Sequence, residues 1–254
     1  MILVTNDDGP YSPGLWLLDE AVRELGKTVI MVPETPKSAS GLGITLHKPL
    51  RINKIKIYGR VVYLTNGTPS DIVYLASKVV NSKLDLVLSG VNVGDNTSIQ
   101  VILSSGTVGA ASQAALEGIP AIAFSAAVKA PDEFERKELR ESIKLSIRKI
   151  VKGVLTKGMP RGIDLLNVNF PDVASSEYEV VPTAKMKYMS IVDKRQDPRG
   201  MEYYWIYGEP ISPEKGTDVY TVHIKKKIAI TPLSPFFRVD VSETVRNHID
   251  SYFT

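Results

Sequence analysis

Short apolar runs alternate with longer amphipathic segments over the first 170 residues, and this alternation restricts the chain to few folds. A short apolar run is typical of a buried strand, and an amphipathic segment is typical of a helix. Strands that alternate with helices form a parallel sheet covered on both faces. We expect strands at 2–5, 28–32, 84–88, 121–124 and 164–170, a hairpin at 51–64 turning at Gly59, and helices at 13–25, 70–80, 106–117 and 133–155.

The number of strands separates the two common architectures of this kind. We count about five or six parallel strands, whereas a closed barrel of alternating strands and helices needs about eight. The sequence therefore predicts a three-layer α/β fold built on a doubly wound, Rossmann-like, mostly parallel sheet. The length of 254 residues suits one large domain, or one domain with a small appendage.

The pattern changes after Pro171, where helical periodicity becomes scarce. Turn sequences at 197–200 and 214–216 separate β-rich segments at 203–206, 219–224 and 228–231, and an amphipathic stretch at 239–252 predicts a C-terminal helix. We expect a Rossmann-like catalytic core at residues 1–180 and a β-rich extension with the C-terminal helix at 181–254. A hairpin that extends from a core often serves oligomerisation.

The amino-acid composition limits the kinds of catalytic and metal site that the chain can form. The chain has no cysteine and only three histidines, which excludes disulfides and cysteine nucleophiles and makes a histidine-rich metal site difficult to build. A bound metal would then depend on oxygen ligands, which suit Mg²⁺ or Mn²⁺. The net charge of +3 comes from scattered residues, so we expect no nucleic-acid polymer as partner. Neither a signal peptide nor a membrane-spanning segment is predicted, and we expect a cytoplasmic enzyme.

Small polar residues gather where the predicted strands end. They occur at 6–9 after the first strand, at 37–41 after the second, and at 89–96 and 104–107 after the strand at 84–88. In open α/β sheets, ligands bind outside the carboxyl ends of the strands. We therefore expect these four segments to form one site.

Asp7 and Asp8 are the strongest candidates in this group. Adjacent carboxylates repel each other, and a divalent cation removes that repulsion by using their oxygens as ligands. Ser38, Ser40 and Asn92 carry neutral oxygens that suit the same cation. Each of these residues is also a common turn former, and an Asp-Asp pair often caps a helix or faces solvent.

Ser105, Gly106 and Thr107 open a predicted helix. The free N–H groups of a helix N-terminus, together with nearby hydroxyls, form an anion pocket, although Ser and Thr also serve there as plain helix caps. A cation site beside an anion pocket indicates phosphoryl chemistry. His47 and His223 are candidate proton shuttles, but a packing or surface role is more common for a histidine.

Several well-known motifs are absent from the sequence. It contains no G-x-x-x-x-G-K-[ST] loop, no G-x-S-x-G elbow and no H-E-x-x-H helix. The alternative function is a non-catalytic or redox nucleotide-binding Rossmann module, which the missing glycine fingerprint disfavours. A third alternative is an interaction protein that kept the scaffold and lost the chemistry, and the intact set of candidate ligands argues against it.

Taken in order, the motifs of nearly the whole chain resemble those of the SurE (survival protein E) family of metal-dependent nucleotidases. They begin with LVTNDDG at 3–9 and Ser38 with Gly41, and continue with 67–71, 89–96, 105–107, 166–171, 197–200, 203–205, 216–218 and 230–233. One such motif would be weak, but this many in the same order are highly specific. The chain departs from the family pattern at Ile72, Ser104 and Lys37, and over 183–188.

The resemblance implies a phosphomonoesterase acting on nucleoside 5′-monophosphates, and in some members on 3′-monophosphates or short polyphosphate. It implies one divalent cation per subunit, Mn²⁺ or Mg²⁺, bound by Asp7, Asp8, Ser38 and Asn92. It also implies a homodimer or homotetramer in which the extension and the C-terminal segment are exchanged between subunits.

On this basis we expect hydrolysis of a phosphate monoester by a metal-activated water. Asp7 and Asp8 are the expected catalytic residues, with Asp8 orienting or deprotonating the nucleophile. The phosphate oxygens are expected to contact a second set of residues, with stabilisation strongest in the transition state: Asn96, Ser105, Gly106, Thr107 and, as a point charge, Lys37.

Overall fold

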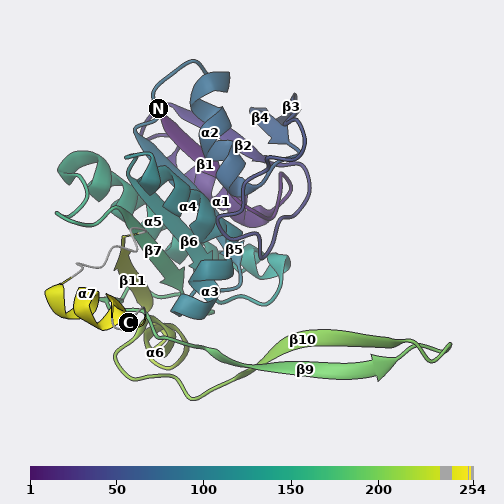
Figure 1. Ribbon diagram of the computed structural model, residues 1–254. Helices are drawn as coiled ribbons and strands as arrows, with labels where there is room; N and C mark the ends of the chain where they lie inside the picture. Colours follow the sequence, from purple (N-terminus) through teal and green to yellow (C-terminus); the bar gives the residue numbers. More distant parts are fainter. Residues whose placement is uncertain (235–241, 251, 253–254) are drawn as a thin grey trace.

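The structure is a computed structural model that describes residues 1–234, 242–250 and 252 (Figure 1). Its strands are β1 (Ile2–Thr5), β2 (Thr28–Pro33), β3 (Ile52–Ile57), β4 (Arg60–Thr65), β5 (Leu86–Val93), β6 (Ala121–Ala126), β7 (Leu165–Phe170), β8 (Tyr178–Val180), β9 (Tyr188–Gln196), β10 (Glu202–Pro210) and β11 (Ile228–Leu233). Its helices are α1 (Pro13–Val22), α2 (Pro69–Val79), α3 (Ile99–Ser104), α4 (Gly106–Leu116), a 3₁₀ turn η1 (Pro131–Glu135), α5 (Lys137–Lys157), α6 (Asp218–His223) and α7 (Glu243–Asp250).

The described strands form one large sheet and one separate hairpin. The order in the large sheet is β3-β4-β2-β1-β5-β6-β7-β11-β8. The central strands from β4 to β7 are all parallel to their neighbours, while β3 runs antiparallel to β4 and β11 antiparallel to β7. The predicted mostly parallel, doubly wound sheet is therefore confirmed, as is the hairpin at 51–64.

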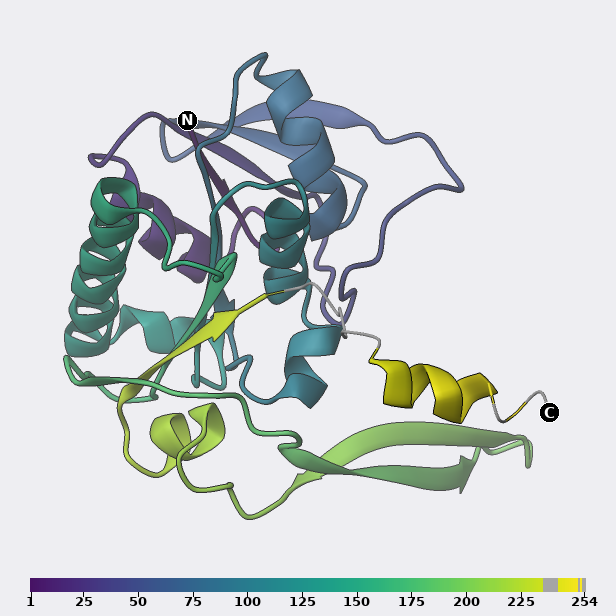
Figure 2. The same ribbon diagram turned by 60° about the vertical axis from the view of Figure 1, so that its left-hand side comes forward.

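Helices cover both faces of this sheet (Figure 2). Helices α1 and α5 pack on each other and on one face, where Leu15, Leu18, Ile143 and Ile147 belong to one apolar core. Helices α2 and α4 cover the other face through a second core that includes Ile72 and a row of small alanines on α4. Each strand of the centre is buried on both sides, which explains its continuous apolar sequence.

The order of the strands reverses next to β1. The chain leaves β1 for β2 and β4 on one side, and it returns through α2 to β5 on the other side. Strand β1 therefore pairs with β2 and with β5, and Thr5 lies opposite Ser89. This is the topological switch point, where open α/β sheets bind their ligands.

The extension differs from its prediction in one element. The segment 219–224, predicted as β-rich, is the helix α6, so that prediction is wrong. Val219 and Val222 are both buried and lie one helical turn apart, and the short segment VYTVH offers too few residues to separate a period of two from one of 3.6. Strands β9 and β10 form an antiparallel hairpin that extends beyond the core (Figure 1).

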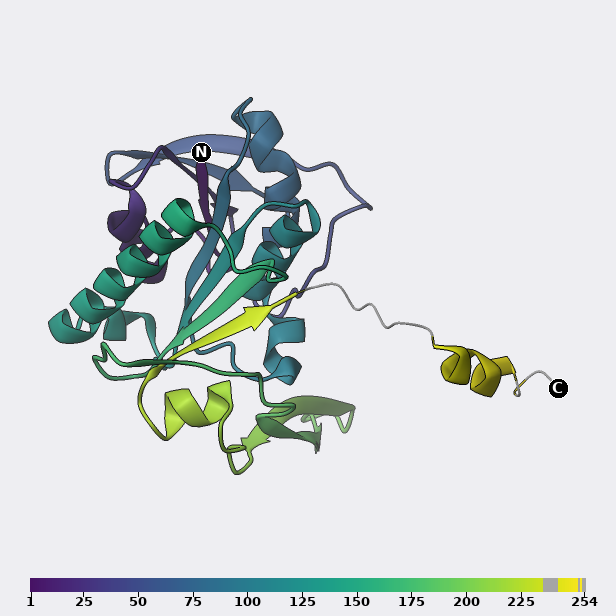
Figure 3. The ribbon, with the colours of Figure 1, turned by 90° about the vertical axis from the view of Figure 1, so that its left-hand side faces the viewer.

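The remaining predicted elements fall close to their expected places. The predicted strand at 228–231 is confirmed as β11, but it pairs with β7 and β8 in the main sheet rather than in the extension. Of the predicted helix at 239–252, α7 is described and appears apart from the core in Figure 3, whereas residues 239–241 and 251 lie outside the described residues. Across the described part of the chain, every helix is too short or too polar to cross a membrane.

Candidate active site

The turn after β1 is fixed by the side chain of Asn6. Its Nδ2 donates to the carbonyl oxygen of Gly9 (2.9 Å), and the Gly9 N–H donates to Asn6 Oδ1 (3.1 Å). Gly9 has a φ of 91°, which glycine adopts without steric cost. This closed turn holds the two residues between Asn6 and Gly9, Asp7 and Asp8, at the carboxyl end of β1.

Asp7 is buried against the start of helix α4. Thr107 Oγ1 donates to Asp7 Oδ1 (2.5 Å), and only 4% of the Asp7 surface is exposed. Burial raises the pKa of Asp7 to about 6, although the hydrogen bond from Thr107 opposes the increase, and the neighbouring Asp8 charge adds to it. Burial disfavours the charged carboxylate, and a nearby cation favours it.

Gly106 allows this close approach. A Cβ on Gly106 would lie 2.7 Å from Ser40 Oγ and 3.0 Å from Asp7 Oδ2. The first turn of α4 therefore packs directly on the carboxylate and on the loop after β2. The Lys37 N–H of the same loop donates to the Asp7 carbonyl oxygen (2.7 Å). The three predicted segments after β1, after β2 and at the start of α4 thus meet, as the sequence predicted.

Asp8 and Ser40 have buried oxygens that the protein leaves unsatisfied. Within the described residues, Asp8 Oδ2 and Ser40 Oγ have no hydrogen-bond partner. Burial also raises the pKa of Asp8, and the Val93 N–H offsets part of that increase. Unsatisfied buried polar atoms are uncommon in folded proteins, and those that occur often bind an ion or a water molecule.

Asn92 contributes a further oxygen at the end of β5. Its Nδ2 donates to the carbonyl oxygens of Val93 (3.1 Å) and Gly94 (2.7 Å), which leaves Oδ1 available as an acceptor. Strand β5 extends to Val93, so Asn92 belongs to the strand rather than to the loop after residue 88 as predicted. Its pairing with β6 shifts register between Ser89 and Asn92, a local change that the apolar pattern does not reveal.

These donors fit a hard divalent cation. The carboxylates of Asp7 and Asp8 and the amide of Asn92 offer oxygen atoms, the kind of ligand that Mg²⁺ and Mn²⁺ prefer. No cluster of three or more His, Cys, Asp or Glu side chains occurs in the described ranges, so a cation here would complete its coordination with neutral oxygens. Ser38, the predicted serine ligand, is exposed, whereas Ser40 on the same loop has its hydroxyl buried beside Gly106.

Of the residues predicted to contact phosphate, two lie beside Asp7 and the others are placed differently. Gly106 and Thr107 lie next to Asp7, and the first N–H groups of a helix have no acceptor within the helix. The Ser105 hydroxyl instead accepts from the Val108 N–H (3.1 Å), as a plain cap of α4. Asn96 is only 5% exposed, and its Nδ2 donates to Ser125 Oγ (2.7 Å). Lys37 is half-buried.

A buried charged cluster, which the sequence did not suggest, lies beside Asn96. Lys187 Nζ contacts both carboxylate oxygens of Asp95 (2.6 and 2.7 Å), and His223 Nε2 lies 3.1 Å from Asp95 Oδ2. Burial alone would raise the pKa of Asp95, but His223 and Lys187 outweigh it and hold the pKa well below its ordinary value. His223, a candidate proton shuttle by sequence, therefore lies in an ion-pair network that joins segments more than 90 residues apart.

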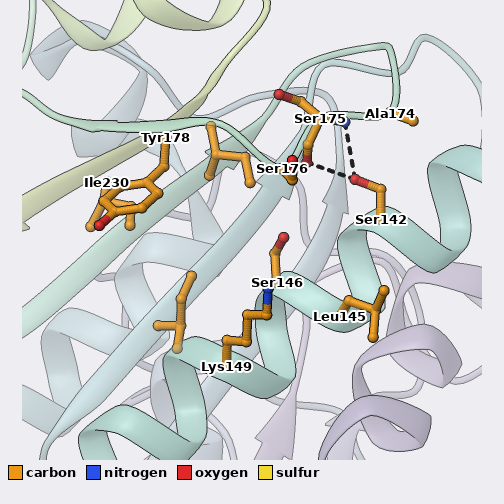
Figure 4. A pocket seen from close by; sticks show the side chains of 11 residues that line it. Ser142, Leu145, Ser146, Lys149, Ala174, Ser175, Ser176, Tyr178 and Ile230 are labelled. Carbon is orange, nitrogen blue, oxygen red and sulfur yellow. Dashed lines mark hydrogen bonds between the residues drawn. The ribbon is translucent and has the colours of Figure 1, made fainter.

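A cavity lined by none of these residues lies between α5 and the strands β8 and β11 (Figure 4). Its volume is about 650 Å³, and Ser142 Oγ at its rim donates to the Ser175 carbonyl oxygen (2.7 Å). Among the described residues of its lining, Lys149 carries the only charge, and the others are serines, Tyr178 and aliphatic residues. A cavity with this lining does not suit a divalent cation, so the carboxyl ends of β1 and β5 remain the candidate active site.

The fold and the site together define a Rossmann-like α/β protein with an oxygen-rich centre at its switch point. The family model described as Survival protein SurE matches residues 2–193. The 5′-nucleotidase SurE of Thermofilum pendens is 57% identical over 233 residues, covering 92% of this chain and 90% of the relative. The 5′-nucleotidase SurE of Hyperthermus butylicus is 57% identical over 246 residues, covering 95% of this chain and 86% of the relative. The chain belongs to the SurE family.

A solved structure agrees with this assignment. The crystal structure of the SurE protein from Aquifex aeolicus matches with a TM-score of 0.81 at 34% sequence identity. The match covers 100% of this chain and 99% of the other. The fold predicted from the sequence, and the family that its motifs resemble, are therefore both confirmed.

Proposed function

We propose that this protein is a metal-dependent 5′-nucleotidase that hydrolyses nucleoside 5′-monophosphates to nucleoside and phosphate. The single observation that carries the proposal is the pair Asp7 and Asp8, held beside the N-terminus of α4 with Asp8 Oδ2 lacking a partner in the described structure. The 5′-nucleotidase name of relatives 46–57% identical to the chain supports it.

The residues that would hold the cation are Asp7, Asp8 and Asn92, with Ser38 or Ser40 from the loop after β2. When bound there, a divalent cation would polarise a phosphoryl oxygen and lower the pKa of a water molecule. Burial makes the Asp7 carboxylate costly to ionise despite its hydrogen bond from Thr107, so the site is electrostatically prepared for a cation.

Asp8 is the residue best suited to orient the attacking water and accept its proton. Its raised pKa makes it a stronger base than an exposed aspartate, and its unsatisfied Oδ2 can accept a hydrogen bond. Asp7, by contrast, already accepts a hydrogen bond from Thr107. The histidine that the sequence offered as a proton shuttle, His223, is engaged with Asp95.

The phosphate oxygens would be bound by the first turn of α4. Gly106 presents backbone without a side chain, and the N-terminal end of the helix carries a partial positive charge. Lys37 adds a point charge from the loop after β2. These groups are fixed before the reaction, which favours them as stabilisers of charge in the transition state.

The extension supports the further proposal that the protein is a homodimer or homotetramer. Residues on both faces of the β9–β10 hairpin are exposed, including Trp205 (59%), Ile206 (77%) and Tyr207 (48%). An isolated two-stranded hairpin is marginally stable in water, so a second copy of the chain is the natural cover for this apolar surface. Exchange of the β9–β10 hairpin and of the C-terminal segment of the extension (residues 181–254) between subunits belongs to the same proposal, while β11 stays paired with β7 of its own chain.

The activity is tested by phosphate release from a panel of substrates with Mn²⁺, Mg²⁺ or EDTA present. The panel contains nucleoside 5′- and 3′-monophosphates, short polyphosphate and p-nitrophenyl phosphate. We expect release from 5′-monophosphates with Mn²⁺ or Mg²⁺ and none with EDTA. Binding of NAD(P) or a nucleotide without metal, and no phosphate release from any substrate, would instead support the non-catalytic or redox module.

A further inference from the structure

A second cavity opens directly beside Asp8, and the proposed mechanism does not use it. Its volume is about 570 Å³, within the ordinary range of small-ligand sites. Asp8 forms one part of its wall, so a phosphate ester bound at the carboxylates would extend its alcohol portion into this space. We call it the Tyr11 pocket, after the aromatic residue in its lining.

The lining is mostly apolar. Tyr11 is 73% exposed, and the other apolar lining residues are Pro10, Pro13, Pro36, Val93 and Pro131. Proline rings and a tyrosine ring are rigid surfaces that lose little conformational entropy when a planar group packs on them. Because every nucleobase has an aromatic face, such a wall suits a base without selecting one base over another.

One charged group in this lining has no assigned role. Glu34 follows β2 directly and lines the Tyr11 pocket. Its backbone is fixed, because the Glu34 N–H donates to the Thr65 carbonyl oxygen (2.8 Å), while its carboxylate has no hydrogen-bond or ion-pair partner among the described residues. A free carboxylate close to a phosphate site is unfavourable for the phosphate unless it serves another part of the ligand.

The chemistry of a carboxylate identifies that part. An ionised carboxylate only accepts hydrogen bonds, and the two vicinal hydroxyls of a ribose can both donate to it. In dinucleotide-binding Rossmann folds, an acidic side chain beyond the first β–α turn accepts from ribose hydroxyls in this way. Glu34 lies after the strand adjacent to β1, at the same edge of the sheet as Asp7 and Asp8.

We propose that the Tyr11 pocket is the nucleoside subsite, in which Glu34 accepts hydrogen bonds from the ribose hydroxyls and Tyr11 packs on the base. The proposal rests on the proposed nucleotidase function and adds the selection of a ribonucleotide over a deoxyribonucleotide. It also favours the 5′-monophosphate, because a 3′-monophosphate lacks one of the two free vicinal hydroxyls.

The test compares substrates that carry different parts of the nucleotide, with the full-length protein and Mn²⁺. AMP carries base and ribose, dAMP lacks the 2′-hydroxyl, ribose 5-phosphate lacks the base, and glycerol 2-phosphate lacks both. We expect Glu34→Ala to lower the AMP to glycerol 2-phosphate ratio of kcat/KM about tenfold, mainly through KM, and to remove most of the AMP to dAMP preference. Tyr11→Ala should lower the AMP to ribose 5-phosphate ratio, and Tyr11→Phe should restore it.

Glu138→Ala, at an exposed position of α5, is the matched control and should leave these ratios unchanged. Equal ratios in wild type and Glu34→Ala would overturn the subsite while leaving the nucleotidase function intact. If no substrate is hydrolysed, the nucleotidase proposal fails instead. The subsite is then tested by calorimetry with adenosine and 2′-deoxyadenosine, which needs no turnover: weaker adenosine binding to Glu34→Ala supports it, and equal binding rejects it.

Discussion

Lys187 and Asp95 form a buried ion pair that joins the start of the β9–β10 hairpin to the loop after β5. Lys187 Nζ lies 2.6 Å from Asp95 Oδ2, and the two side chains are only 10% and 6% exposed. The loop continues into Asn96, whose N–H donates to Asn169 Oδ1 (2.7 Å). Asp218, whose carboxylate accepts from the Ser98 and Ala184 N–H groups, ties the same segments together. The extension therefore helps to shape the edge of the candidate active site.

Replacing Lys187 by Met should destabilise the protein strongly. Removing one partner of a buried pair leaves the other charge uncompensated, which costs about 3 kcal/mol or more of the free energy of unfolding. Lys227→Met is the matched control, because its pair with Glu177 is 32% and 70% exposed and solvent screens such pairs, so the loss of stability should be small. Urea denaturation of both variants measures the difference, and equal losses would contradict a stabilising role for the buried pair.

The same cluster predicts a dependence of stability on pH. His223 and Lys187 hold the pKa of Asp95 below its ordinary value despite burial, and the unfolded chain has the ordinary value of about 3.9. The stability from the ionised Asp95 is therefore complete above about pH 5 and is lost as the pH falls below about 4. Asp95→Asn should reduce the stability near pH 7 and make it less sensitive to acid. If the free energy of unfolding of the wild type and of Asp95→Asn changed with pH in the same way, Asp95 would not titrate as proposed.

The parts of the fold and site that sequence could predict are those with local causes. The apolar runs of β1, β2, β5, β6 and β7 reflect burial on both faces of the sheet, and the polar residues after β1 and β2 follow from where those strands end.

What sequence could not predict depends on contacts between distant segments. Nothing near Asp95 indicates that a lysine 92 residues later neutralises it, and nothing in the apolar pattern of β11 shows that it returns to pair with β7. Ser40 rather than Ser38 has its hydroxyl oxygen buried, next to Gly106, which is more than 60 residues away in the sequence.

Gly106→Ala should abolish most activity without unfolding the protein. The added Cβ would lie 2.7 Å from Ser40 Oγ and 3.0 Å from Asp7 Oδ2, so the carboxylate must move. A shift of about 1 Å in a catalytic group can lower the rate about 100-fold. Gly153→Ala in α5 is the control, because its Cβ would meet nothing within 4 Å and helix propensity should stabilise it by up to about 1 kcal/mol. Normal phosphate release by Gly106→Ala would argue against this geometry.

Metal binding should stabilise the protein through Asp7. A ligand present at about 100 times its Kd adds about 2.7 kcal/mol to the free energy of unfolding, which corresponds to a rise in Tm of about 5–10 °C for a chain of this size. Because burial raises the pKa of Asp7 to about 6, proton and cation compete, and the apparent affinity for Mn²⁺ should increase as the pH rises through about 6.

Asp7→Asn should lose most of this Tm shift, whereas Asp132→Asn, an exposed aspartate in η1, should keep it. Differential scanning calorimetry with Mn²⁺ and with EDTA provides the measurement. An undiminished shift in Asp7→Asn would place the cation elsewhere.

The exposed hairpin predicts that charge on its apolar face weakens self-association. Trp205 and Tyr207 lie two residues apart on β10 and share one face of the hairpin, opposite Asp193 and Ile191 of β9. Trp205→Lys combined with Tyr207→Lys should shift the protein toward the monomer in sedimentation velocity, because a buried lysine pair is costly in an apolar interface. Leu155→Lys is the control, since Leu155 is 40% exposed near the end of α5, away from the hairpin. If the double variant sediments as the wild type does, the subunits associate through another surface.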